Sequence, residues 1–127
     1  MVDALFSQTN YVAAKKTLDA VALRQEAIAS NIANIETPGY KRLDLAPNFQ
    51  AELQRACASG DAQQIATLIP SLAPDPTAVP QSQDGNTVCL EQEMGELNQN
   101  ALLHTLETQL VSGTLYRLKM AITGKSS

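Results

Sequence analysis

Aromatic residues are scarce in this chain, and the features that mark several common protein classes are absent from it. It has no tryptophan, and aromatics make up only 4% of its 127 residues. A compact core usually buries more aromatic volume than that. No apolar run approaches the ~20 residues that a helix needs to cross a bilayer, so we expect no direct membrane insertion. The first residues lack the basic start and continuous apolar stretch of a cleavable secretion signal. This composition favours thin, closely packed helices built from alanine and aliphatic side chains.

Basic charge and metal-binding side chains are also in short supply. Nine Lys and Arg residues stand against thirteen Asp and Glu residues, for a net charge of -4. A chain with this balance and no basic run is a poor candidate for binding nucleic acid. The single histidine, His104, has no clustered ligands, and the spacing of Cys57 and Cys89 fits no zinc or redox motif. On one helix Cys89 and His104 would stand ~22 Å apart. We therefore predict no catalytic, metal-binding or cofactor-binding residues, and a protein that is not an enzyme.

Prolines divide the chain into three parts. Residues 1–37 contain neither proline nor glycine, residues 86–127 contain no proline, and five of the six prolines lie between residues 47 and 80. Proline is excluded from helix interiors, so this pattern predicts helix, irregular middle and helix. We place the boundaries at 1–42, 43–85 and 86–127, together forming one helical domain. The middle carries the acidic excess. Short helices could form at 48–58 and 61–68, and 70–84 is expected to be loop or disordered chain without a strand.

Both flanks have the heptad spacing of a coiled coil, with apolar residues alternating three and four positions apart. The first predicts a helix of about 30 residues that ends at Thr37-Pro38-Gly39. Its seam is Tyr11, Ala14, Leu18, Val21, Gln25, Ile28, Ile32 and Ile35. The second seam is Leu90, Met94, Leu97, Ala101, His104, Thr108, Val111, Leu115, Leu118 and Ile122.

We expect a mainly α fold in which the two long amphipathic helices pack as an antiparallel, coiled-coil-like pair. Leu103, Leu106 and Leu110 widen the second stripe beyond what one partner helix covers. Two interpretations of the surplus stay open. The stripe is covered by another protein or another copy, or the middle segment folds back over it.

The most specific stretch is Ala27–Arg42. Asn31 and Asn34 carry amides that can satisfy carbonyls freed at a helix end. Pro38 and Gly39 then turn the chain, which lets Tyr40 pack back against the helix. Lys41 and Arg42 are interpreted as a solvated face, with contact to an acidic neighbour as the alternative.

This stretch closely resembles the Ser-Asn-x-Ala-Asn-x-x-Thr-x-Gly-Tyr signature of bacterial flagellar axial proteins, the rod, hook and hook-junction subunits. A second stretch, Asp84–Met94 followed by Leu97 and Asn100, is similar to the C-terminal signature of the small proximal rod subunit. Cys89 and His104 depart from that pattern, which more often has a polar or acidic residue and a tyrosine at those places.

The resemblance implies a structural subunit whose copies stack helically into a hollow rod for motility. It implies contacts with other copies, other rod proteins and the rod–MS-ring adaptor. It also implies export to the periplasmic rod of the basal body by the flagellar type III apparatus, without a cleaved signal. The residues expected to make these contacts are Leu18, Val21, Ile28, Asn31, Ile32, Asn34, Ile35, Thr37, Pro38, Gly39, Tyr40, Leu90, Met94, Leu97, Val111, Leu115, Leu118 and Ile122. The alternatives are another small rod subunit and a soluble helical adaptor or export chaperone.

Overall fold

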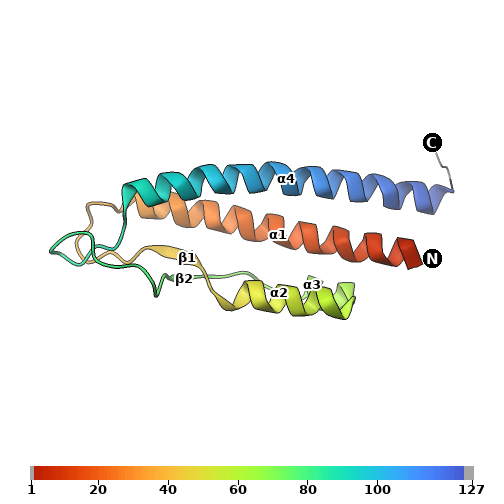
Figure 1. Ribbon diagram of the computed structural model, residues 1–127, viewed down its shortest axis with the longest axis horizontal. Coiled ribbons are helices and arrows are strands. Elements are labelled where there is room, and N and C mark those ends of the chain that lie inside the picture. The colour runs from red at the N-terminus through yellow and green to blue at the C-terminus, as the bar shows by residue number, and fades with distance from the viewer. Residues whose placement is uncertain (1, 125–127) are drawn as a thin grey trace.

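Two long helices dominate the molecule. The computed structural model describes residues 2–124, with side chains from residue 8 onward. Residues 1 and 125–127 of the expected terminal segments lie outside this range. Helix α1 (Val2–Ala33) and helix α4 (Leu90–Thr123) run antiparallel along each other for most of their length (Figure 1). The expectation of two long helices that pack together is confirmed. Between them come four short elements, β1 (Leu43–Leu45), α2 (Asn48–Ser59), α3 (Ala62–Ala66) and β2 (Leu72–Pro74).

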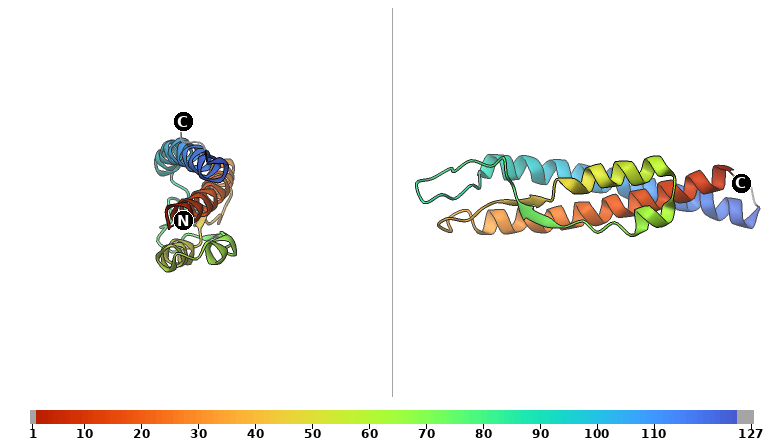
Figure 2. Two further views of the ribbon diagram at one scale, coloured as in Figure 1. Left: turned by 90° about the vertical axis from the view of Figure 1, so that its right-hand side faces the viewer. Right: turned by 90° about the horizontal axis from the view of Figure 1, so that it is seen from below.

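Helix α1 is the middle layer. The end-on view in Figure 2 places α4 on one side of it and α2 and α3 on the other. Ala20 of α1 is buried with Phe49, Leu53 and Ala56 of α2 and with Ile65 of α3. Alanine on α1 lets the short helices approach closely, which is how a chain with so few aromatics closes this small core. The short helices agree with those expected at 48–58 and 61–68.

The middle segment is more ordered than the sequence indicated, and the expectation that it contains no strand is wrong. β1 and β2 pair antiparallel with Leu43 opposite Pro74 and Leu45 opposite Leu72. Two more backbone bonds extend the ladder, from Ala46 N to the Ser71 carbonyl at 2.8 Å and from Asp75 N to the Arg42 carbonyl at 2.9 Å. Strands of three residues are too short to show a hydrophobic period.

The first helix ends earlier than expected. α1 stops at Ala33, and turns occupy the residues up to Gly39, whose φ of 72° lies in the left-handed region that glycine tolerates. The Asn34 side chain donates to the Ser30 carbonyl at 2.8 Å. Such side-chain bonds compete with the helical ladder and favour a turn at this point.

Helix α4 meets α1 through a face rotated by about one position from the predicted seam. Its buried residues are Glu93, Asn100 and Thr114, and all three lie on one heptad register. Apolar Leu97, Val111 and Leu118 are half-buried beside them. Met94 and Leu115 are each 47% exposed, so much of these two side chains lies outside the α1–α4 contact. The helix–helix contact is partly polar, and much of the apolar stripe is left outside it.

None of the helices in the described part of the chain combines the length and the hydrophobicity needed to cross a membrane.

Candidate functional site

The side chain of Asn31 joins three parts of the chain at the end of α1. It is fully buried, and its amide nitrogen donates to the Leu43 carbonyl at 2.9 Å and to Glu93 Oε2 at 3.2 Å. Its carbonyl oxygen accepts bonds from Leu43 N at 2.8 Å and from the Tyr40 hydroxyl at 3.2 Å. Ser30 also bonds that hydroxyl, at 2.9 Å. An amide can make about four hydrogen bonds, and here all of them are made. Asn31 therefore fixes the end of α1 against β1 and the first turn of α4.

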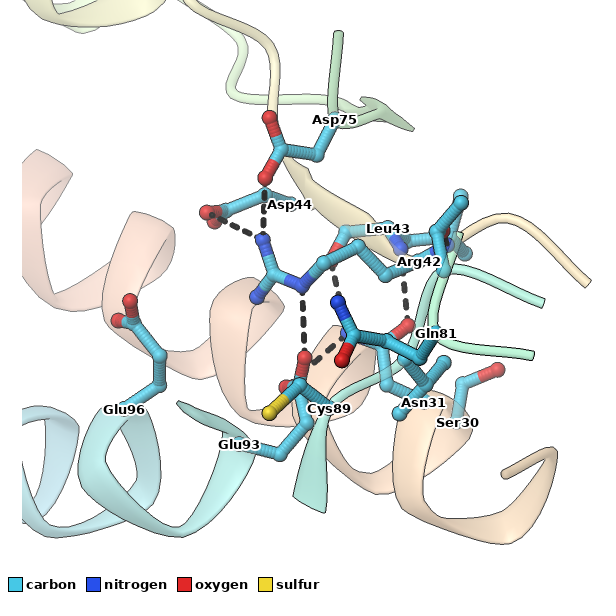
Figure 3. A network of polar contacts seen from close by, with 12 residues as sticks. Ser30, Asn31, Arg42, Leu43, Asp44, Asp75, Gln81, Cys89, Glu93 and Glu96 are labelled. Carbon is cyan, nitrogen blue, oxygen red and sulfur yellow. Dashed lines mark hydrogen bonds and ion pairs between the residues drawn. The ribbon is translucent and has the colours of Figure 1, made fainter. Parts of the chain in front are cut away.

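Arg42 is the cationic centre of this region. Figure 3 shows its guanidinium between Glu93 on one side and Asp75 and Asp44 on the other. Arg42 Nε donates to Glu93 Oε1 at 2.6 Å, and an Nη atom donates to Asp75 Oδ2 at 2.6 Å and approaches Asp44 Oδ2 at 3.5 Å. Its backbone N–H donates to the Thr87 hydroxyl at 2.8 Å. We call Asn31, Arg42, Asp75, Asn86 and Glu93 the polar lock.

Two of the three charged residues of the lock are deeply buried, and Asp75 is half-buried. Arg42 is 2% exposed and Glu93 is 0% exposed. Burial by itself lowers the pKa of Arg42, but the hydrogen bonds to Glu93 and Asp75 outweigh it, and the pKa is raised. For Asp75, burial raises the pKa, while bonds from Thr77 and Arg42 outweigh it and lower the pKa below its ordinary value. Both groups are therefore held in their charged forms, as a compensated buried pair requires.

Asn86 closes the lock from the other side. Its side-chain nitrogen lies within hydrogen-bond distance of three carbonyls in the turn that follows α1, those of Asn34 at 2.9 Å, Ile35 at 3.1 Å and Thr37 at 2.8 Å. Its side-chain oxygen accepts from Val88 N at 2.8 Å, just before α4 begins. These carbonyls belong to the turn after Ala33, so one buried amide holds that turn in place. The end of α1 and the start of α4 are thus tied directly.

Arg24 adds a more exposed ion pair along the helices. It contacts Asp44 at 3.1 Å and Glu96 at 3.0 Å, linking α1, β1 and α4. Residues 2–124 contain no group of three or more side chains arranged to hold a metal ion. The carboxylates of the lock are bonded to cations or amides. The arrangement therefore joins distant chain segments rigidly to one another.

A second notable surface is the outside of α4. Of the ten large hydrophobic residues that are exposed among residues 8–124, eight lie on this helix. They are Leu90, Met94, Leu102, Leu106, Leu110, Leu115, Tyr116 and Ile122. Exposed apolar side chains gathered on one helix make it a candidate interaction surface.

Comparison with known proteins agrees on one family. Residues 13–41, which include most of α1 and the turn at Tyr40, match the sequence profile of the family described as "Flagella basal body rod protein". The flagellar basal body rod protein FlgB of Escherichia coli K12 is 34% identical over 117 residues, which cover 80% of this chain and 83% of that protein. FlgB of Cereibacter sphaeroides is 36% identical, covering 80% of this chain and 84% of that protein. FlgB of Borrelia hermsii is 32% identical, covering 76% and 83%.

The chain belongs to the FlgB family of flagellar basal body rod proteins. It is a structural subunit of the bacterial flagellar rod. The match to the rod-protein family profile ends at Lys41, next to Arg42, so it includes the α1 side of the polar lock. The family resemblance expected from the Asn31–Tyr40 stretch is therefore confirmed.

The structure separates the predicted contact residues of this FlgB-family chain into three groups. Five have side chains or backbone groups bonded around the polar lock, namely Asn31, Asn34, Ile35, Thr37 and Tyr40. Those buried or half-buried beside α1 and α4 are Leu18, Val21, Ile28, Ile32, Leu97, Val111 and Leu118. Those exposed are Pro38, Gly39, Leu90, Met94, Leu115 and Ile122.

Sequence reasoning missed the charged half of the lock. Arg42 was expected on a solvated face, and that interpretation is wrong because Glu93 and Asp75 enclose its guanidinium. Its neighbour Lys41 is exposed and reaches only the Gly85 carbonyl, at 2.8 Å. One pattern in the sequence could have revealed Glu93, since it shares a heptad register with Asn100. A polar residue repeated at one heptad position of an otherwise apolar helix indicates a specific polar contact.

Proposed function

We propose that this chain builds the proximal section of the hollow flagellar rod, and that its terminal helices make the contacts. The partners in this proposal are other copies of the chain, other rod proteins and the rod–MS-ring adaptor. The chain would reach the periplasmic rod through the flagellar type III export apparatus without a cleaved signal, and it would perform no catalysis.

The observation that supports this proposal best is the exposed apolar surface of α4. Burying apolar area yields roughly 25 cal/mol per Å². The chain's own middle segment leaves this stabilisation unused, because α2, α3 and the strands lie on the far side of α1 (Figure 2). If a neighbouring subunit covers α4, burial of these apolar side chains would stabilise the contact between the two subunits. Of the two interpretations of the wide stripe, coverage by a neighbour fits this arrangement better than a closed monomer.

The polar lock gives the helices a fixed starting geometry for such contacts. Arg42 and Asn86 hold the turn after α1 against the start of α4. A rod that transmits torque needs subunits whose helices keep their relative position. We infer that the lock supplies this rigidity at one end of the pair, and that the exposed helix faces supply the contacts.

The predicted contact residues enter the proposal in two roles. Leu90, Met94, Leu115 and Ile122 are exposed and would touch neighbours directly. Val21, Ile28, Leu97 and Leu118 would contribute indirectly, because they hold α1 and α4 together.

The proposal is tested by placing a charge on the exposed apolar face. Leu115→Asp should abolish incorporation into purified basal bodies, since a carboxylate is costly to bury in an apolar contact. The matched control is Gln54→Asp, an exposed polar position on α2, on the far side of α1, that should assemble normally. Circular dichroism of both variants shows whether they fold. Normal incorporation of a folded Leu115→Asp chain would refute the proposed contact.

Electron microscopy of a strain that lacks the gene tests the function itself. We expect basal-body rings without a rod, and motility restored when the gene is returned. Intact rods in that strain would overturn the proposal and favour a soluble adaptor.

A further inference from the structure

A groove runs between the two long helices on one flank of the pair. It has a volume of about 540 Å³ and is lined by Val21, Ala22 and Gln25 of α1 and by Asn100, Ala101, His104 and Thr105 of α4. The short side chains of Ala22 and Ala101 leave room between the helices. Beneath them, the Asn100 amide donates to Gln25 Oε1 at 3.1 Å and to the Val21 carbonyl at 3.0 Å, which fixes the groove floor. No Asp, Glu, Lys or Arg lines the groove.

A row of leucines projects from the other flank of α4. Leu102, Leu106 and Leu110 are four residues apart, so they share one side of the helix. They are 61%, 47% and 53% exposed. At 3.6 residues per turn, Leu106 lies roughly 140° around the helix from Ala101. The row therefore points away from the groove, and a chain cannot fill its own groove with it.

The two surfaces match in shape and charge. One is a concave channel with short walls, and the other is a convex row of aliphatic side chains, which is how helices pack ridge into groove. Neither surface carries a charged side chain, so docking would not require any charged group to lose its hydration. The heptad seam also includes the groove residues Val21, Gln25, Ala101 and His104, as expected if that repeat serves a third helix in addition to the α1–α4 contact.

We propose that the leucine row of one copy of this chain docks into the α1–α4 groove of a second copy. The inference rests on the proposed function and names the surfaces by which copies meet. The two surfaces differ and lie on different flanks, so the contact is heterologous. Each bound copy presents a fresh groove or a fresh row to the next, and such contacts repeat around a ring or along a helical stack.

The test is a disulfide cross-link between two differently tagged copies assembled together in cells, both with Cys57→Ser and Cys89→Ser. One copy carries Ala22→Cys in the groove wall and the other carries Leu106→Cys in the row. After mild oxidation of purified basal bodies, we expect a cross-linked dimer that contains both tags. The control pair replaces Ala22→Cys with Ala51→Cys, an exposed alanine on α2 beyond α1, and should give no dimer above background.

The outcomes separate the inference from the proposed function. Basal bodies that contain both copies without a specific cross-link would overturn the docking and leave the rod function standing, and so would a Leu106→Cys copy linked only to a different protein. Absence of the unmodified chain from basal bodies would refute both. If the cysteine variants fail to assemble, Ala22→Leu gives a second test, because a larger side chain fills the groove. It should block incorporation while Ala51→Leu does not, and normal incorporation of Ala22→Leu would overturn the docking.

Discussion

Replacing Arg42 by methionine should be among the most damaging single changes in this chain. The substitution keeps an unbranched side chain of similar length and removes the charge. Glu93, which is 0% exposed, then stays buried with its charge uncompensated, and Asp75 loses its 2.6 Å partner. Removing one member of a buried ion pair typically costs about 3–5 kcal/mol. A domain of this size has a free energy of unfolding of about 5–15 kcal/mol, so the loss is a large fraction of the total.

Urea denaturation followed by circular dichroism measures this loss. With an m-value of about 2 kcal/mol/M, the midpoint should fall by roughly 2 M. Lys41→Met is the matched control, because Lys41 is exposed and donates only to one backbone carbonyl, and it should change stability by less than about 0.5 kcal/mol.

A double-mutant cycle tests the stated cause. Glu93→Met combined with Arg42→Met leaves neither member of that pair charged, so the double variant should be more stable than Arg42→Met alone. A loss below about 1 kcal/mol for Arg42→Met would refute the reasoning. So would strict additivity of the two single changes, because it would mean that Arg42 and Glu93 do not depend on each other.

Two further predictions concern the buried amide of Asn86 and the half-buried acid Glu107. Asn86→Ala should cost about 2–3 kcal/mol, because carbonyls of Asn34, Ile35 and Thr37 lose a buried donor, whereas the exposed loop control Gln83→Ala should be nearly neutral. Equal urea midpoints for these two variants would show that Asn86 does not stabilise the turn after α1. Burial raises the pKa of Glu107 above its ordinary value of 4.5, so its ionised form destabilises the fold at neutral pH. Glu107→Gln should therefore raise the urea midpoint at pH ~7, and the advantage over the unsubstituted chain should shrink as the pH falls through the raised pKa and vanish below ~4. A glutamine variant that is less stable than the parent at neutral pH would argue against this sign.

The sequence by itself determined the two long helices and the turn at residues 37–39, although the helix before that turn ends earlier, at Ala33. Long stretches without proline allow helices, and repeated apolar spacing gives each of them a buried side. The Thr37-Pro38-Gly39 run accounts for the turn, since Gly39 takes the positive φ that other residues avoid. These are local properties of the backbone and can be read without knowing any neighbour. The Asn31–Tyr40 motif was specific enough to indicate the family.

Only the tertiary structure decided which side of α4 faces α1. The apolar stripe on that helix is wide, and several rotations would bury part of it. Glu93 fixes the rotation through Arg42, and Asn100 does so through Gln25 and the Val21 carbonyl, because buried polar groups must find partners. Those partners come from chain segments 51 and 75–79 residues away, and periodicity carries no information about them.

The burial of Arg42 and the short sheet were likewise set by distant contacts. Asp75 lies 33 residues from Arg42, and the β1–β2 ladder that brings them together has only three residue pairs. An arginine in a sequence is ordinarily read as exposed, because a buried charge is costly unless it is paired. Here the partners come from α4 and from the end of β2. Which distant segments meet at Arg42 cannot be predicted from the spacing of residues along the sequence.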